Sequence, residues 1–392
     1  MTSPTTASAE NARKGYNRHM KKELLFLILL CVFFGPSEGV AQELHQDLQG
    51  TERAEVLSII KEEERDIIGT DAKALVQTVS ARLLSGEQKG EVVVFDNDLA
   101  VLEKGDVIFI NHIITINGDE YYTFKDADRR GVLVGLGVLL AALLMFFAGR
   151  QGLRALVSLV ASILAILFLL VPALLAGYPP VLSSVGIAGI VLALILFVTH
   201  GVNARTTIAF VGTFGAVFAT GLVAYFWVEA ANLTGFASDA SVYLNISTRG
   251  ALDFPALLLG SIIIGMLGVL DDVAITQASV TQELKAANNS FEFSELYRRA
   301  IRVGRDHVAS LVNTLAFAYV GAALPLILLL ARTDAEFGLL VNQEMVAAEI
   351  VRIIVGSIGL ILAVPLTTLV AAWWYSTHSV GDLSGGHGHH HH

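Results

Sequence analysis

Long apolar runs fill the C-terminal two-thirds of this chain and constrain its fold more than any other feature. A helix needs about 20 apolar residues to cross a bilayer, and about seven runs approach or exceed that length. They cover residues 131–148, 154–176, 181–200, 206–228, 254–282, 308–331 and 350–375. Only 16% of the 392 residues are charged, against about 25% in soluble domains. The sequence therefore predicts a polytopic α-helical membrane protein.

The two ends of the chain differ from this bundle. Residues 1–19 are polar and predicted to be a disordered extension. Residues 20–41 combine a basic lead, a short apolar core and the small-residue stretch "GVAQ". They form either a signal peptide or a first transmembrane anchor, and both place the following residues outside the cytoplasm. Residues 378–392 end in "GGHGHHHH", which is either a purification tag or a native metal-binding tail.

Residues 42–130 are predicted to form a β-rich extracytoplasmic domain after the first helix. Its opening part, residues 44–67, is highly charged and is predicted to be helical. Short β-like runs follow: "LVQTVSARLL", "EVVVF", "DVIFI", "HIITI" and "EYYTF". The dipeptide Asn117-Gly118 between the last two runs indicates a hairpin. These features predict a small barrel of about five strands, with no catalytic constellation.

Residues 131–377 are predicted to form the transmembrane bundle, about seven helices that make about eight with the first. Basic residues test the orientation, because they favour cytoplasmic links. With the β-domain outside, the cytoplasmic links include a long loop over residues 283–307. The basic residues on the predicted inner side are Arg150, Arg154, Arg205, Lys285, Arg298, Arg299, Arg302 and Arg305. The C-terminus is then cytoplasmic.

One predicted span carries two adjacent acids, Asp271 and Asp272, in "GMLGVLDDVAITQ". On a helix, small and polar residues recur every three or four positions and form one stripe. Its members are Ser261, Gly265, Gly268, Asp272, Thr276, Ser279 and Glu283. Small residues let membrane helices pack closely, so Ser261, Gly265 and Gly268 are predicted to pack against protein, with Asp272 at the centre of the stripe. Asp271 lies about 100° round the helix.

Acids inside a membrane span are costly unless they are paired, hydrated or protonated. Two adjacent carboxylates therefore favour a site that exchanges protons or binds a cation. The alternative is that the helix ends near Asp271 and both acids lie at the cytoplasmic surface. Against it, residues 273–280 remain largely apolar, and basic residues resume only at Lys285.

Other residues are candidates to complete this site. Asn313 and Thr314 lie on the next, antiparallel helix and are predicted to reach the depth of Asp272, where Thr276 would join them. The secondary candidates are His200, Asn203, Gln277 and Ser279. His200 is a possible proton relay, although a histidine at a helix end is more often simply solvated. Glycine pairs predicted to serve helix packing are Gly212 with Gly215 and Gly356 with Gly359. No metal-ligand set is predicted.

The stretch "GMLGVLDDVAITQASVTQEL" resembles the signature of YibE/F-like bacterial membrane proteins. "SGEQKGE" and "EKGD" are similar to turns in the β region of that family, so the resemblance covers about residues 75–375. It implies a multi-pass protein of the bacterial inner membrane, regarded as a transporter without an established substrate. A weaker similarity is to proton-driven permeases of the resistance-nodulation-division and SecD/SecF type. This chain lacks the large outer domain of those permeases.

The expected function is a secondary transporter coupled to a proton or another cation through Asp271 and Asp272. No G-x-x-x-x-G-K-[ST] loop occurs in the chain, so energy would come from an ion gradient or a partner. We expect no enzyme activity, no cofactor and no nucleic-acid partner. The expected partners are the lipid bilayer, a proton or cation and a small substrate, and a paired membrane protein of the same family is left open. Two alternatives remain: an envelope accessory or assembly protein, and a metal-ion transporter.

Overall fold

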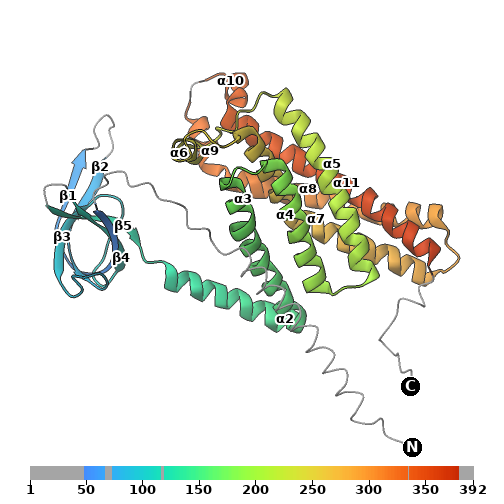
Figure 1. The fold of residues 1–392 in the computed structure, drawn as a ribbon, viewed down its shortest axis with the longest axis horizontal. Helices are drawn as coiled ribbons and strands as arrows, with labels where there is room; N and C mark the ends of the chain where they lie inside the picture. Colours follow the sequence, from blue (N-terminus) through green and yellow to red (C-terminus); the bar gives the residue numbers. More distant parts are fainter. Residues whose placement is uncertain (1–47, 67–72, 116–118, 334, 379–392) are drawn as a thin grey trace, which may run out of the picture. The chain divides into compact units, whose positions relative to one another are not determined.

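The structure is a computed structural model that describes residues 48–66, 73–115, 119–333 and 335–378. It divides into two compact units, whose boundary falls between Leu143 and Leu144. Among the described residues, the N-terminal unit contains every β-strand and the start of one helix, and the C-terminal unit is helical (Figure 1). The first predicted segment, residues 20–41, and the His-rich end lie outside the described residues.

The N-terminal unit is a single antiparallel sheet with the strand order β3-β2-β1-β4-β5. The strands are β1 (Leu48–Asp66), β2 (Lys73–Leu83), β3 (Val92–Asn97), β4 (Val107–Ile114) and β5 (Glu120–Ala127). The edge strands β3 and β5 also contact each other, so the sheet curls into a half-barrel (Figure 1). Alternate side chains enclose its core, which includes Val56, Val79, Phe95, Ile108 and Ile110.

The predicted helix over residues 44–67 is wrong, because residues 48–66 form β1, the longest described strand. Its charged residues suit a local helix, yet Ala54 and Val56 are buried at alternate positions and their strand pairs with both β2 and β4. Cross-strand pairing outweighed local propensity here. The runs "DVIFI" and "HIITI" are likewise not two strands, since Val107–Ile114 is continuous. Residues 117 and 118 lie outside the described residues, although β4 and β5 do pair antiparallel.

The described helices begin at Arg130. They are α2 (Arg130–Ala165), α3 (Val171–Leu175), α4 (Pro180–Ala193), α5 (Ala204–Ala230), α6 (Asp239–Ser247), α7 (Phe254–Ala287), α8 (Phe293–Ala322), α9 (Leu324–Ala331), α10 (Phe337–Asn342) and α11 (Glu344–Thr377). Two π-helical turns, η1 (Ile166–Leu170) and η2 (Leu194–Val198), continue α2 and α4. The predicted loop 283–307 is wrong for most of its length, because α7 and α8 extend into it and leave only residues 288–292 as a link.

Among the described residues, five helices are long and apolar enough to cross a membrane, or six if a bent pair counts as one span. Fewer spans than predicted result because runs 131–148 and 154–176 share one helical stretch, Arg130–Leu175. Gly149 interrupts that stretch with φ 53° and ψ −128°, a backbone conformation that glycine adopts readily. Run 308–331 forms the bent pair, in which α8 and α9 meet at 64°.

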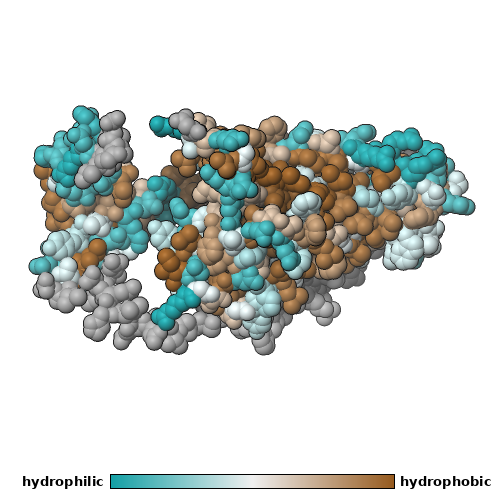
Figure 2. All heavy atoms as spheres, turned by 90° about the horizontal axis from the view of Figure 1, so that it is seen from above, coloured by the Kyte–Doolittle hydropathy of each residue, from teal (hydrophilic) through white to brown (hydrophobic). Residues whose placement is uncertain are grey.

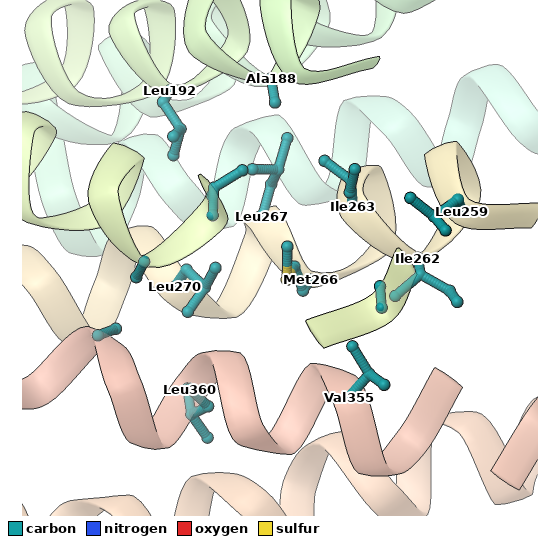
Figure 3. Packing of buried hydrophobic residues seen from close by; sticks show 14 of the residues in the cluster. Ala188, Leu192, Leu259, Ile262, Ile263, Met266, Leu267, Leu270, Val355 and Leu360 are labelled. Atoms are coloured by element: carbon teal, nitrogen blue, oxygen red, sulfur yellow. The ribbon is translucent and has the colours of Figure 1, made fainter. Parts of the chain in front are cut away.

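Helix α7 is the centre of the helical unit. Its most apolar window is 61% buried, against 50% or less for the other four candidate spans. Figure 3 shows Ile263, Met266 and Leu270 of α7 packed among side chains of α4 and α11. Close van der Waals contact stabilises such packing of apolar helices, and this face of α7 makes it with two neighbouring helices.

Close helix contacts explain three of the four glycines in the two predicted pairs, Gly212 with Gly215 and Gly356 with Gly359. A Cβ added to Gly212 would lie 2.6 Å from Thr367 Cα, so α5 and α11 approach backbone to backbone there. Added Cβ atoms would likewise contact Leu315 at Gly356 and Thr220 at Gly359. Gly215 is the exception, because nothing lies within 4 Å of its added Cβ.

The surface of the helical unit is largely apolar, and hydrophilic side chains gather at its right-hand end in the view of Figure 2. Large apolar side chains are exposed along the candidate spans; Phe218 of α5 is 57% exposed and Ile361 of α11 is 48% exposed. Extended apolar surface on a single chain marks contact with lipid or with other protein. The apolar helices therefore fit a membrane protein.

Candidate functional site

Asp271 and Asp272 lie near the middle of α7 rather than at its end. At 1.5 Å per residue, Asp272 is about 27 Å from the first residue of the helix and about 22 Å from the last. Asp271 is half-buried, and its Oδ1 atom is buried without a hydrogen-bond partner among the described residues. Asp272 is exposed. The helix does not end at the acids, so their placement at a helix terminus is excluded.

Asp272 borders a cavity of about 240 Å³ between α7, α8 and α11. Thr276 and Gln277 of α7 line the same cavity. His307 and Leu311 of α8 also line it, and α11 contributes Val364. The volume exceeds the roughly 30 Å³ that one water molecule occupies in the liquid. The cavity can therefore hold several waters between a carboxylate and an imidazole, as proton transfer requires.

Gln277 joins the three helices around this cavity. Its side chain is 3% exposed, and its Nε2 atom donates to Ala300 O and to Thr368 Oγ1, both at 2.8 Å. Thr368 in turn donates to Val364 O of its own helix. A Cβ added to Gly304 would lie 2.7 Å from Gln277 Oε1, so α8 fits closely here. The secondary candidate Gln277 is thus a buried polar link between α7, α8 and α11.

The polar stripe on α7 is largely uncovered within this chain, so its packing against protein stays a prediction. Six of its seven members are exposed: Ser261, Gly265, Gly268, Asp272, Thr276 and Glu283. Only Ser279 is half-buried, and its Oγ donates to Ile275 O at 2.8 Å. The larger apolar face of α7 packs on α4, α5 and α11 instead, since bulky side chains gain more from packing than small ones do.

Part of the stripe still approaches α8. A Cβ added to Gly265 would lie 2.6 Å from Tyr319 Oη, whereas nothing lies within 4 Å of one added to Gly268. The stripe therefore faces a groove beside α8 that is occupied at Gly265 and open at Gly268 and Asp272.

Asn313 and Thr314 are not among the residues that line the cavity. Both are exposed, and Thr314 Oγ1 donates to Ser310 O of its own helix at 3.1 Å. The α8 residues that line the cavity are Gly304, His307, Val308 and Leu311. Asn313 and Thr314 lie nearer to the far end of α8 than this group, so the structure does not bring them to Asp272.

The other two secondary candidates lie at the start of α5. Asn203 caps that helix, because its side chain accepts from Thr206 N at 3.0 Å and Thr206 Oγ1 accepts from Asn203 N at 3.1 Å. Such a reciprocal cap explains Asn203 structurally. His200 is half-buried, and the charges of Arg205 and Asp272 act on its imidazole. It does not line the cavity.

His307 is the cavity residue that the sequence analysis missed. The sequence contained a signal for it. In a pair of antiparallel helices joined by a short link, residues equally far from the link lie opposite each other. The link is residues 288–292, so Asp272 is matched by a position close to His307 and not by Asn313. The predicted loop over residues 283–307 implied a different pairing of the two helices, in which Asn313 lies opposite Asp272.

Among the described residues, no group of three or more histidine, cysteine, aspartate or glutamate side chains could hold a metal ion. The His-rich end lies outside the described residues. Asp272, Thr276, Gln277 and His307 line one cavity, and Asp271 precedes Asp272 on the same helix.

Comparison with known proteins supplies one match. The family model for YibE/F-like proteins matches residues 136–377, which is more than half of the chain. The matched region contains α7, α8 and α11 but not the β-strand turns that also carried the resemblance. No curated protein and no solved structure matches the sequence.

Proposed function

This chain belongs to the YibE/F-like protein family, and we propose that it is a proton-coupled secondary transporter of the bacterial inner membrane. The observation that supports this proposal is the pair Asp271 and Asp272 in the middle of the central helix, with Asp272 beside the cavity that also contains His307. Ionisable groups inside a span are costly and usually mark an ion or proton pathway.

The proposed topology has about eight spans, with the two halves of Arg130–Leu175 crossing separately on either side of Gly149. The β-unit is then extracytoplasmic, and the C-terminus is cytoplasmic. Basic residues support this orientation, because Lys285 lies in the last turn of α7 and arginines line the first half of α8. These arginines are Arg298, Arg299, Arg302 and Arg305.

In the proposed mechanism, the two acids exchange one proton. Two ionised carboxylates side by side repel each other, and Asp271 Oδ1 has no donor among the described residues to offset burial. The repulsion therefore favours a proton on one of the two carboxylates, and the cavity beside Asp272 gives that proton a route in or out. His307 faces Asp272 across this cavity, and imidazole exchanges protons near neutral pH. His307 accepts a proton from the cytoplasmic side and donates it to the Asp272 carboxylate.

An accessory role is the second candidate, and the exposed stripe on α7 favours it. Ser261, Gly265 and Gly268 are exposed on a candidate span, and small residues of this kind often pack against another membrane helix. A paired membrane protein of the same family would suit that face. Under this alternative, Asp→Asn changes should be tolerated, because amides also form hydrogen bonds. No observation among the described residues favours the metal-ion alternative.

Proton flux into sealed proteoliposomes tests the proposal. The full-length protein is reconstituted with a pH-sensitive dye inside, and an inside-negative potential draws protons inward. We expect acidification by the unchanged protein and its loss in Asp272→Asn and Asp271→Asn. The matched control is Glu283→Gln, which neutralises an exposed carboxylate near the end of the same helix. Equal flux in all four proteins, with equal folding, would overturn proton coupling through these acids.

A further inference from the structure

A second cavity lies at the other end of α7, where α5 ends and α7 begins. Its volume is about 520 Å³, within the range of about 300–1,000 Å³ that is typical of small-molecule sites. Val228 of α5, Leu233 of the following turn and Leu259 of α7 supply buried apolar lining, with exposed fractions of 3%, 6% and 2%. The walls thus offer apolar surface to the body of a ligand.

Two carboxylates, Glu229 and Asp253, give this cavity a single sign of charge. No lysine, arginine or histidine is among its lining residues. Tyr225 precedes Glu229 by one helical turn and lines the same cavity, and Asp253 Oδ1 accepts from Ala256 N at 3.0 Å. This bond orients Asp253 but uses only part of the acceptor capacity of the two carboxylates. A cleft lined by one sign of charge attracts the opposite charge.

The cavity is formed by a turn that packs directly on α7. Gly235 has φ 81°, and a Cβ added there would clash with Phe254 O at the start of α7. Leu233 N donates to Val228 O at 3.1 Å and fixes the turn to the end of α5. The lining is therefore largely preformed, which reduces the cost of ordering on binding.

We infer that this cavity binds amphipathic organic cations, molecules with one positive charge on an apolar body. The apolar lining disfavours sugars and inorganic ions, and the paired acids disfavour anions. Tyr225 adds an aromatic ring that can contact the cationic centre. That such cations are the transported substrate rests on the proposed function, whereas their binding does not.

The cation cavity is separate from the proton site. Asp253 caps the start of α7 and Asp272 lies near its middle. At 1.5 Å per residue they are about 28 Å apart along the helix. The central helix therefore connects a cargo site at its first turn to a proton site at its middle, and each can be removed without the other.

Binding of tetraphenylphosphonium to the purified full-length protein tests this inference. Tetraphenylborate is the matched probe, because it has the same shape and the opposite charge. We expect saturable phosphonium binding that Glu229→Gln and Asp253→Asn each weaken about tenfold. Both changes remove a charge at nearly constant side-chain size, and asparagine caps a helix as well as aspartate. Asp239→Asn, an exposed acid on α6 that does not line the cavity, should bind as the unchanged protein does.

Separate outcomes distinguish this inference from the proposed function. Unchanged phosphonium binding in the Glu229→Gln/Asp253→Asn double variant, or equal competition by tetraphenylborate, would overturn the cation site. Asp272→Asn should retain phosphonium binding whether or not proton flux fails. Retained binding with no proton flux in any variant would leave the cavity a cation site and reject coupling.

Discussion

Replacing Gln277 by leucine should loosen the helices around the proton site. The change removes both hydrogen bonds from Nε2, to Ala300 O and Thr368 Oγ1. Side-chain hydrogen bonds between membrane helices average about 0.6 kcal/mol and reach about 1.7 kcal/mol. Two such bonds predict a loss of about 1–3 kcal/mol in the free energy of unfolding. Leucine preserves most of the side-chain volume, so loss of packing adds little to this value.

A double-mutant cycle separates this effect from a general packing defect. Thr368→Val removes one of the two Gln277 bonds together with the bond from Thr368 to Val364 O inside α11, so only the coupling between the two changes reports the bond between the helices. The two changes should couple by about 0.5–1.5 kcal/mol, since they share one bond. The free energy is measured from reversible unfolding in mixed micelles. Gln282→Leu, at a half-buried position on the same helix, is the control.

A loss below about 0.5 kcal/mol for Gln277→Leu would refute this reasoning, because that is the range of neutral surface changes. Strict additivity of the double variant would also refute it. Either result would mean that Gln277 does not connect α7 to α8 and α11 in the protein.

Three further predictions concern other parts of the chain. Gly212→Ala should lower the unfolding temperature, because its Cβ would lie 2.6 Å from a backbone atom. Gly215→Ala should raise the unfolding temperature, because nothing lies within 4 Å of its Cβ and alanine favours a helix more than glycine does. Hydrogen bonding to Arg130 holds the pKa of Asp128 well below its usual range. The ionised Asp128 carboxylate therefore stabilises the β-unit above about pH 4, and this stabilisation is lost as the pH falls further. Hydrogen exchange should show that the stability of Asp128→Asn no longer falls with this acid step. His307→Gln should slow proton flux, because it removes the imidazole that lines the cavity beside Asp272, and flux equal to that of the unchanged protein would contradict its role.

Membrane-spanning length was predictable because it follows from bilayer thickness alone. The number of spans was less so. Gly149 interrupts one helical stretch without ending it, and Leu324–Ala331 bends from α8 by 64°. Hydropathy reports how apolar a run is, but it does not report where a helix continues, bends or breaks.

The charged stretch Leu48–Asp66 shows the limit of local preference. Its glutamates and lysine favour a helix when read alone, yet the strand pairs with segments up to 66 residues away, as Leu48 does with Ile114. Such partners are visible only after the sheet has formed. The short runs after Ala74 were easier to interpret, because their alternation persists in the buried and exposed positions of β2 and β3.

The depth of the acids was predictable, whereas their direction was not. Apolar residues on both sides of Asp271 and Asp272 placed them in mid-helix. Which face of α7 turns inward depends on its larger neighbours α4, α5 and α11, and these outweighed the stripe of small residues. The register of α8 depended on the length of one link, and five link residues in place of a long loop bring His307 to Asp272 rather than Asn313.

The central claim is that the acid pair takes up and releases a proton inside the membrane. Infrared difference spectroscopy of the reconstituted full-length protein, between acidic and alkaline buffer, measures this directly through the carbonyl stretch of a protonated carboxylic acid. The account predicts a reversible carboxylic-acid band that disappears in Asp271→Asn/Asp272→Asn and persists in Glu283→Gln. A band that is unchanged in the double variant would contradict the account, because the exchanging proton would then belong to another group.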